Sequence, residues 1–359
     1  MSPTDSTSTG QALFAAGPPR LTPQDAAGLA AQHYGLQARA DVLSSERDQN
    51  FRLTLDDGRR FVLKVTHPAE DPAVTDFHTQ AQLWLMRAGG AVPIPRLLAG
   101  RHGDYVHWHE DDAGMRRAIR LITFVAGRPL HSVPRSAAQR RHLGLALARF
   151  DQALAGFSHP MADHELLWDL QHADRLADLL PQVDDPGRRR LAERHLQHFA
   201  DAVRPRLAGL RRQVIHNDLN AYNVMVDDVD PAQISALLDF GDMVRAPLVQ
   251  DIAVACAYQL DDAADPLSNA ARDCLASYHR ELPLTESELL LLPDLIVARL
   301  LITVLITGWR ARQHPENRQY ILRNNGLAWN GLERLDALSR TQAQAIVLDA
   351  CQPFTENSP

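Results

Sequence analysis

The chain has 359 residues, a formal net charge of −7 and a hydrophobic fraction of 45%. This length provides enough apolar surface for one large domain or for two lobes with an ample core. No basic block and no interleaving of basic with aromatic residues occurs in the sequence, so nucleic acid is not expected as a partner.

Residues 1–20 are polar and rich in Ser and Thr, and they lack the basic and apolar regions of a signal peptide. We expect a disordered tail there. The most apolar stretch, Leu289 to Ile306, is interrupted by Pro293, Asp294 and Arg299, which argues against a membrane span and predicts a buried pair of helices. The three cysteines show no metal-ligand spacing, and their scarcity favours a reducing, cytoplasmic setting.

The sequence from Thr22 to Val65 predicts a helix followed by strands. Thr22 is suited to cap a helix that has Pro23 at its first position and ends at Gly35. Asp57-Gly58 predicts a hairpin turn that leads into a strand at 60–65. That strand contains Lys64, whose ammonium could reach the α- and β-phosphates of a nucleotide. The alternative is an edge-strand lysine with its ammonium in water.

A polar turn precedes this strand at 44–50 in place of a glycine-rich loop. Hydroxyl and backbone N–H groups in a tight turn can cover phosphates. Ser44, Ser45 and Asn50 are therefore candidate nucleotide-binding residues, with a plain solvated hairpin as the alternative.

Residues 72–89 have an apolar stripe at helical spacing. Kinases usually place a glutamate on the corresponding helix to pair with the strand lysine. This segment contains no glutamate, and the residue of the stripe best placed to face Lys64 is His78. We expect either a neutral His78 that accepts a hydrogen bond from Lys64 or a lysine without a partner on this helix; an ordinary histidine at the edge of the core is the alternative.

An apolar strand at 118–125 runs into Gly127, which predicts a hinge between two lobes. The backbone of Thr123, Phe124 and Val125 could bind the purine edge of a nucleotide. Helical periodicity dominates after this point.

The strongest motif lies in the second half of the chain. His216, Asp218 and Asn223 form the pattern H-x-D-x-x-x-x-N between two apolar runs, which is the spacing of a kinase catalytic loop. A third apolar run ends in D-F-G at Asp239, and a hairpin turn at 227–231 separates the two motifs. An Asp after an apolar run is often only a turn residue, but the two motifs together predict phosphoryl transfer. In this reading Asp218 orients the attacking hydroxyl, and Asn223 and Asp239 bind Mg²⁺.

Two further acidic residues are candidates for binding an ammonium group of the acceptor. These are Asp169 and Asp242, for which a cap or a turn is the alternative role. Asp251 opens an apolar segment, where a helix N-cap is the expected role.

With these motifs in place, the chain resembles the aminoglycoside phosphotransferase superfamily, and most of all its hydroxylysine kinase-like branch. The likeness extends from about Leu21 to Leu338 and rests on five segments: S-E-R-D-Q-N-F at 45–51, F-V-L-K at 61–64, H-P at 159–160, L-W-D-L at 167–170 and H-N-D-L-N at 216–220. The resemblance implies an α+β fold of the bilobal protein-kinase-like type, with a small antiparallel-sheet lobe at 21–125 and a mostly helical lobe at 126–359.

The resemblance also implies roles. Asp218 matches the catalytic aspartate, Asn223 and Asp239 match the Mg²⁺ ligands, and Lys64 matches the phosphate-binding lysine. The expected function is transfer of the γ-phosphoryl group of ATP or GTP to a hydroxyl of an amino alcohol or a hydroxylated amino acid. Alternatives are a kinase for an aminoglycoside, homoserine or choline, or a nucleotide-binding module without catalysis.

Overall fold

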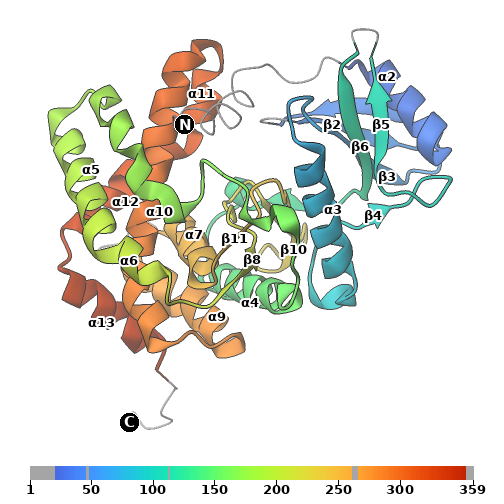
Figure 1. Ribbon diagram of the computed structural model, residues 1–359. Coiled ribbons are helices and arrows are strands. Elements are labelled where there is room, and N and C mark those ends of the chain that lie inside the picture. Colours follow the sequence, from blue (N-terminus) through green and yellow to red (C-terminus); the bar gives the residue numbers. More distant parts are fainter. Residues whose placement is uncertain (1–20, 46–47, 112–113, 261–265, 353–359) are drawn as a thin grey trace.

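The computed structural model describes residues 21–45, 48–111, 114–260 and 266–352. Figure 1 shows a smaller lobe built on a β-sheet and a larger lobe made mostly of helices, as in a protein-kinase-like α+β fold. The tail expected at 1–20 lies outside the described residues.

The small lobe contains a six-stranded antiparallel sheet. Its strands lie in the order β1 (Arg39–Leu43), β2 (Gln49–Thr54), β3 (Arg60–Val65), β6 (Arg116–Thr123) and β4 (Leu97–Leu98), and β5 (His107–Glu110) pairs with β6. Alternate residues such as Phe51, Leu53, Leu63 and Leu121 are fully or almost fully buried on one face. The hairpin predicted at Asp57-Gly58 joins β2 to β3.

Helix α2 (Pro23–Leu29) covers the buried face of this sheet. Its first turn is fixed by a capping box between Thr22 and Asp25, and the helical segment continues as the π-helical turn η1 (Ala30–Tyr34). Gly35 ends it with φ +70°, a conformation that costs glycine little. The helix predicted between Thr22 and Gly35 is confirmed.

Helix α3 (Pro72–Met86) lies between the two lobes, with Asp71 as its N-cap. Phe77, Ala81 and Leu85 belong to the core cluster of the large lobe. The indole Nε1 of Trp84 donates a hydrogen bond of 2.8 Å to the carbonyl oxygen of Ala153, so α3 is attached directly to the large lobe.

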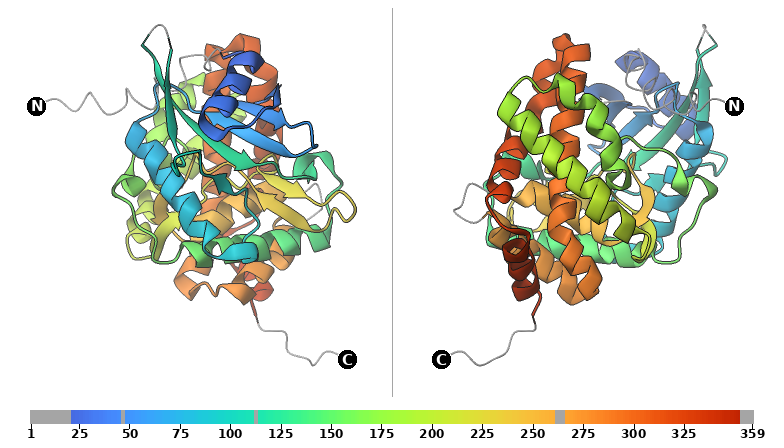
Figure 2. Two further views of the ribbon diagram at one scale, coloured as in Figure 1. Left: turned by 90° about the vertical axis from the view of Figure 1, so that its right-hand side faces the viewer. Right: turned by 60° about the vertical axis from the view of Figure 1, so that its left-hand side comes forward.

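The large lobe is organised around α10 (Glu286–Gln313), which runs through it in orange (Figure 2). This helix packs against α7 (Val249–Gln259), α12 (Asn325–Asp336), α13 (Arg340–Ala350) and the 3₁₀ segment η5 (Leu170–Gln182). The other longer helices are α4 (Ala137–Leu154) and α5 (Pro186–His198), and the shorter ones are α6 (Arg204–Leu207), α8 (Pro266–Asn269), α9 (Ala276–Glu281) and α11 (Arg318–Ile321).

The helix pair expected at 289–306 is wrong, because this stretch is one continuous helix that includes Pro293. Within the described residues α10 is long and apolar enough to cross a membrane, but 83% of its most apolar 18-residue window is buried inside the protein. That degree of burial is typical of the central helix of a folded lobe.

Two small antiparallel sheets hold the loops that carry the predicted catalytic residues. One pairs β8 (Arg212–Ile215) with β11 (Val244–Pro247). The other has the order β10 (Ile234–Leu237), β9 (Val224–Val226) and β7 (Arg128–Pro129). The hairpin predicted at 227–231 connects β9 to β10 and thereby brings the two motifs side by side.

Candidate active site

The loop between β8 and β9 begins with His216, whose ring is fully buried beside Phe150 and Phe240. Its Nε2 lies 2.9 Å from the carbonyl oxygen of Leu238, and its Nδ1 accepts the backbone N–H of Asp218 at 3.3 Å. A carbonyl oxygen can only accept, so Nε2 is the donor in this contact. His216 therefore joins the catalytic loop to the end of the D-F-G strand.

Asp251 of α7 binds the backbone of this loop. Its carboxylate accepts the backbone N–H of His216 at 2.7 Å and that of Asn217 at 2.8 Å. These bonds stabilise Asn217 in a left-handed conformation, with φ +65°. The N-cap role expected for Asp251 is wrong, because Asp251 lies inside the first turn of α7 and is fully buried.

A second buried acid lies beside Asp251. Asp151 of α4 is fully buried and accepts a hydrogen bond of 2.6 Å from the hydroxyl of Tyr278. Burial, reinforced by the charge of Asp251, raises the pKa of Asp151 well above its usual range. Its Oδ1 has no hydrogen-bond partner in the described part of the chain.

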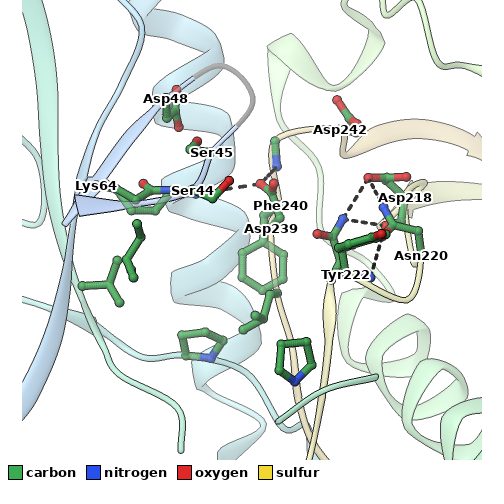
Figure 3. Close-up of a pocket in the computed structure, with 18 of the residues that line it drawn as sticks. Ser44, Ser45, Asp48, Lys64, Asp218, Asn220, Tyr222, Asp239, Phe240 and Asp242 are labelled. Carbon is green, nitrogen blue, oxygen red and sulfur yellow. Dashed lines mark hydrogen bonds and ion pairs between the residues drawn. The ribbon is translucent and has the colours of Figure 1, made fainter. Parts of the chain in front are cut away.

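The carboxylate of Asp218 is held by three side chains, one of which is Asn220 (Figure 3). Oδ2 accepts from Asn220 at 2.9 Å and from Asn223 at 2.8 Å, whereas Oδ1 accepts from Arg299 at 2.5 Å. Burial raises the pKa of Asp218 to about 7, and Arg299 opposes this rise. A carboxyl group with a pKa near neutrality is suited to accept a proton during catalysis.

Asp239 follows β10 and adopts a left-handed conformation with φ +63°. The next residue, Phe240, stacks on Phe150 at a centroid distance of 6.0 Å, which anchors the motif in the core. The Asp239 side chain is 55% exposed, and its Oδ1 lies 3.8 Å from Nζ of Lys64. A carboxylate in this position faces both lobes.

The donor set fits a magnesium ion. Both hydrogen bonds from Nδ2 of Asn223 go to Asp218, to its main-chain oxygen and to Oδ2, so the amide oxygen of Asn223 points elsewhere. This oxygen and the carboxylate of Asp239 are hard oxygen ligands of the type that Mg²⁺ prefers, and they would hold the ion if it were bound. No cluster of three His, Cys, Asp or Glu residues that could hold a metal occurs in the described ranges.

Lys64, Asp218, Asn223 and Asp239 line one cavity of about 620 Å³ between the lobes. Of the residues predicted from the sequence, those that line it are Ser44, Ser45, Asn50, Lys64, Thr123, Phe124, Val125, Asp218, Asn223, Asp239 and Asp242. Residues 46 and 47 of the predicted phosphate-covering turn lie outside the described residues.

Asp169 is a helix-capping residue rather than a ligand in this cavity. It is almost fully buried and is not part of the cavity wall. Its carboxylate accepts the backbone N–H of Gln171 and bonds from the side chains of Gln171 and Gln250. The substrate role predicted for Asp169 is therefore wrong, whereas its alternative role as a cap is found.

Lys64 has no ion pair with a carboxylate of α3 in the described structure, as expected for a helix without a glutamate. The acid on α3, Asp76, lies 3.2 Å from His159 instead of pairing with Lys64. The ring of His78 is almost fully buried and also lines the cavity, and its Nδ1 lies 3.6 Å from Glu70, which precedes the helix. The ion pair of Lys64 within the described residues is the one with Asp239.

The sequence reasoning missed Arg299 and Asp251 as parts of the site. Arg299 was noted only as an interruption of an apolar run. A charged residue inside such a run must have a partner when buried, which was a usable signal. Asp251 gave no comparable signal, because an acid at the start of an apolar helix fits an ordinary cap.

Fold and site together define a kinase-like phosphotransferase. Residues 40–284 match the model of the Phosphotransferase enzyme family (APH), and the chain belongs to this family. It is therefore a phosphotransferase that acts on a hydroxyl group.

Among its relatives are hydroxylysine kinases. The chain is 24% identical to the hydroxylysine kinase of Mus musculus, with 94% of this chain and 95% of the relative covered. It is 25% identical to that of Danio rerio, with 94% and 98% covered.

Solved structures share the fold. An amicoumacin kinase in complex with AMP-PNP, Ca²⁺ and Ami aligns with a TM-score of 0.66 at 16% identity, over 89% of this chain and 95% of that one. A microcompartment-associated aminopropanol kinase aligns with a TM-score of 0.59 at 20% identity, over 91% and 98%.

Proposed function

We propose that the protein is a Mg²⁺-dependent small-molecule kinase that transfers the γ-phosphoryl group of ATP or GTP to a hydroxyl of an amino alcohol or a hydroxylated amino acid. The observation that carries this proposal is the arrangement of Asp218, Asn223 and Asp239 opposite Lys64 in one cavity. The relatives' names, hydroxylysine kinase and aminopropanol kinase, support this class of acceptor.

Each side chain has a defined task in this proposal. Lys64 binds phosphate oxygens, and the backbone at 123–125 binds the purine edge. Asn223 and Asp239 hold Mg²⁺, which neutralises charge on the phosphates when bound. Asp218 orients the acceptor hydroxyl and receives its proton late, because the transition state is loose.

Asp242 is the candidate for binding an ammonium group of the acceptor. It lines the cavity close enough to Asp218 for its charge to raise the pKa of that residue (Figure 3). An acceptor ammonium between the two carboxylates would relieve this repulsion. An amino group near the reacting hydroxyl is the chemistry that such a position recognises.

The proposal extends to the setting of the enzyme. The division into a nucleotide-binding lobe at 21–125 and a catalytic lobe at 126–359 fits the end of β6 at Thr123. Buried free thiols at Cys256 and Cys274 support a reducing, cytoplasmic location.

A panel of acceptors tests the proposal. Release of ADP or GDP is measured with 5-hydroxylysine, 1-amino-2-propanol, homoserine, choline and kanamycin, each with Mg²⁺ and with ATP or GTP. We expect turnover with the first two and loss of that turnover in Asp218→Asn. Turnover confined to homoserine, choline or kanamycin would support the alternative acceptors. Nucleotide binding without turnover on any alcohol would support a binding module.

A further inference from the structure

Arg299 is among the largest fully buried side chains of the described structure, with 2% of it exposed. It lies in the middle of α10, where Leu300, Leu301 and Ile302 follow it and are also buried. Burial of an unpaired guanidinium would be prohibitively costly, so its position requires strong compensating contacts.

The guanidinium contacts the catalytic loop and two aromatic residues that line the cavity, Tyr258 and Trp168. Nη2 donates to Oδ1 of Asp218 at 2.5 Å, and Nη1 donates to the carbonyl oxygen of Asn217 at 3.4 Å. Nε and Nη2 also donate to the hydroxyl of Tyr258 at 3.2 and 3.0 Å. The guanidinium lies 5.2 Å from the ring centroid of Trp168 and 5.3 Å from that of Tyr258.

This guanidinium completes the support of the catalytic carboxylate. Asn220 and Asn223 hold Oδ2 of Asp218, and they belong to the same loop as Asp218 itself. Arg299 holds the other oxygen from a rigid helix of the lobe. With one donor from outside the loop and two from within it, the plane of the carboxylate is fixed before an acceptor arrives.

We propose that Arg299 is a positioning residue for catalysis: it fixes Oδ1 of Asp218, and thereby the whole carboxylate, in the orientation that the acceptor hydroxyl requires. The inference rests on the proposed function. In the transfer step the acceptor oxygen forms a bond to the γ-phosphorus while the bond to the bridging β-phosphate oxygen breaks. The hydroxyl proton passes to Asp218, the nucleoside diphosphate leaves, and Arg299 keeps its own proton throughout.

A positioning role differs measurably from a role in acceptor binding. A misplacement of about 1 Å in a reacting group can cost on the order of 10²-fold in rate. A residue that only positions Asp218 therefore affects kcat and leaves the KM of the acceptor unchanged. A residue that binds the acceptor raises KM.

The test compares Arg299→Met with Arg299→Lys in the full chain. We expect Arg299→Met to lower kcat by about 10²-fold or more, with acceptor KM and nucleotide Kd within about threefold of wild type. Lysine retains the charge and one donor but lacks the planar fork, so Arg299→Lys should recover about tenfold of the loss. Tyr258→Phe, which removes one partner of the guanidinium, should give a smaller fall in kcat.

Arg211→Met serves as the control, because it also removes an arginine that binds a carboxylate of α10. Arg211 binds Glu288 at the start of this helix through two hydrogen bonds, of 2.9 and 2.6 Å, and is not part of the cavity wall. We expect this variant to lower Tm while kcat stays within threefold of wild type. An equal fall in kcat for Arg211→Met at the same loss of Tm would overturn the proposal, as would a raised acceptor KM with normal kcat in Arg299→Met.

Two readouts need no identified alcohol. The first is the slow hydrolysis of Mg-ATP with water as acceptor, which should fall in Arg299→Met. The second is a double-mutant cycle of Arg299→Met and Asp218→Asn on Tm, in which we expect non-additive shifts. Unchanged hydrolysis or additive shifts would overturn the inference about Arg299. A wild-type enzyme that is inactive on every alcohol but shows both effects would overturn only the proposed function.

Discussion

Lys64 of β3 and Asp239 of the loop after β10 face each other across the cavity, with 3.8 Å between Nζ and Oδ1. One residue comes from the sheet lobe and the other from the helical lobe, and Figure 3 shows both side chains directed into the space between them. The lysine side chain is only 18% exposed, so this contact provides a counter-charge that α3 does not supply. Because both residues are proposed to act on the nucleotide, the pair marks where phosphates and metal would come between the lobes.

We expect Lys64→Ala to weaken nucleotide binding and to slow transfer. The substitution removes a charge-assisted contact to phosphate, worth about 1.5–3 kcal/mol, or roughly 10- to 150-fold in affinity. His78→Ala should cost less, because His78 contacts Glu70 rather than Lys64. Titration calorimetry with a non-hydrolysable nucleotide measures both variants, and an equal or larger loss for His78→Ala would contradict this order.

Asp218→Asn should retain nucleotide binding and lower kcat by about 10²-fold or more, the order expected when a positioned proton acceptor is lost. Asparagine keeps the size of the side chain but cannot take up the proton. Turnover measured with the best acceptor of the panel decides the matter. Near-normal turnover would exclude Asp218 as the catalytic residue.

Asp239→Ala should abolish Mg²⁺-dependent transfer, since the carboxylate is proposed to hold the metal against the phosphates. Activity is measured as a function of Mg²⁺ concentration. Asp228→Ala provides a control, because Asp228 is an exposed acid on the hairpin that precedes the motif. Normal turnover of Asp239→Ala at millimolar Mg²⁺ would place the metal site elsewhere.

The sequence predicted that the residues of the two motifs lie close together, because each motif is local. The hairpin between β9 and β10 places Asn223 and Asp239 at neighbouring strand ends. A hairpin can be recognised in the sequence, and it implies that these two residues lie close together. Arg299 contacts Asp218, which lies 81 residues earlier in the chain. A charged residue inside an apolar helix must have a partner when buried, but the sequence does not show which residue that partner is.

The two misassigned acids show why residue type alone is insufficient. Asp169 and Asp251 both lie at the start of helical segments, and both accept backbone N–H groups. Asp169 caps its own segment, whereas Asp251 binds the catalytic loop. The difference depends on which loop packs against the helix, which only the tertiary fold determines.

The buried Asp151 predicts an unusual dependence of stability on pH. The pKa of Asp151 is raised by burial and by Asp251, while an aspartate in the unfolded chain has a pKa of about 3.9. The folded state therefore holds a proton that the unfolded state releases above this value. The stabilisation is complete below about pH 4 and is lost as pH rises through the folded pKa, by up to about 1.4 kcal/mol per pH unit.

Asp151→Asn removes this titration and keeps an oxygen that can accept from Tyr278. We expect the free energy of unfolding of wild type to fall relative to that of the variant as pH rises from 5 to 9. Urea denaturation at several pH values measures the difference, and Asp228→Asn serves as a control that should follow the wild-type profile. Wild-type and Asp151→Asn profiles that run parallel over this range would mean that Asp151 is already ionised in the folded protein.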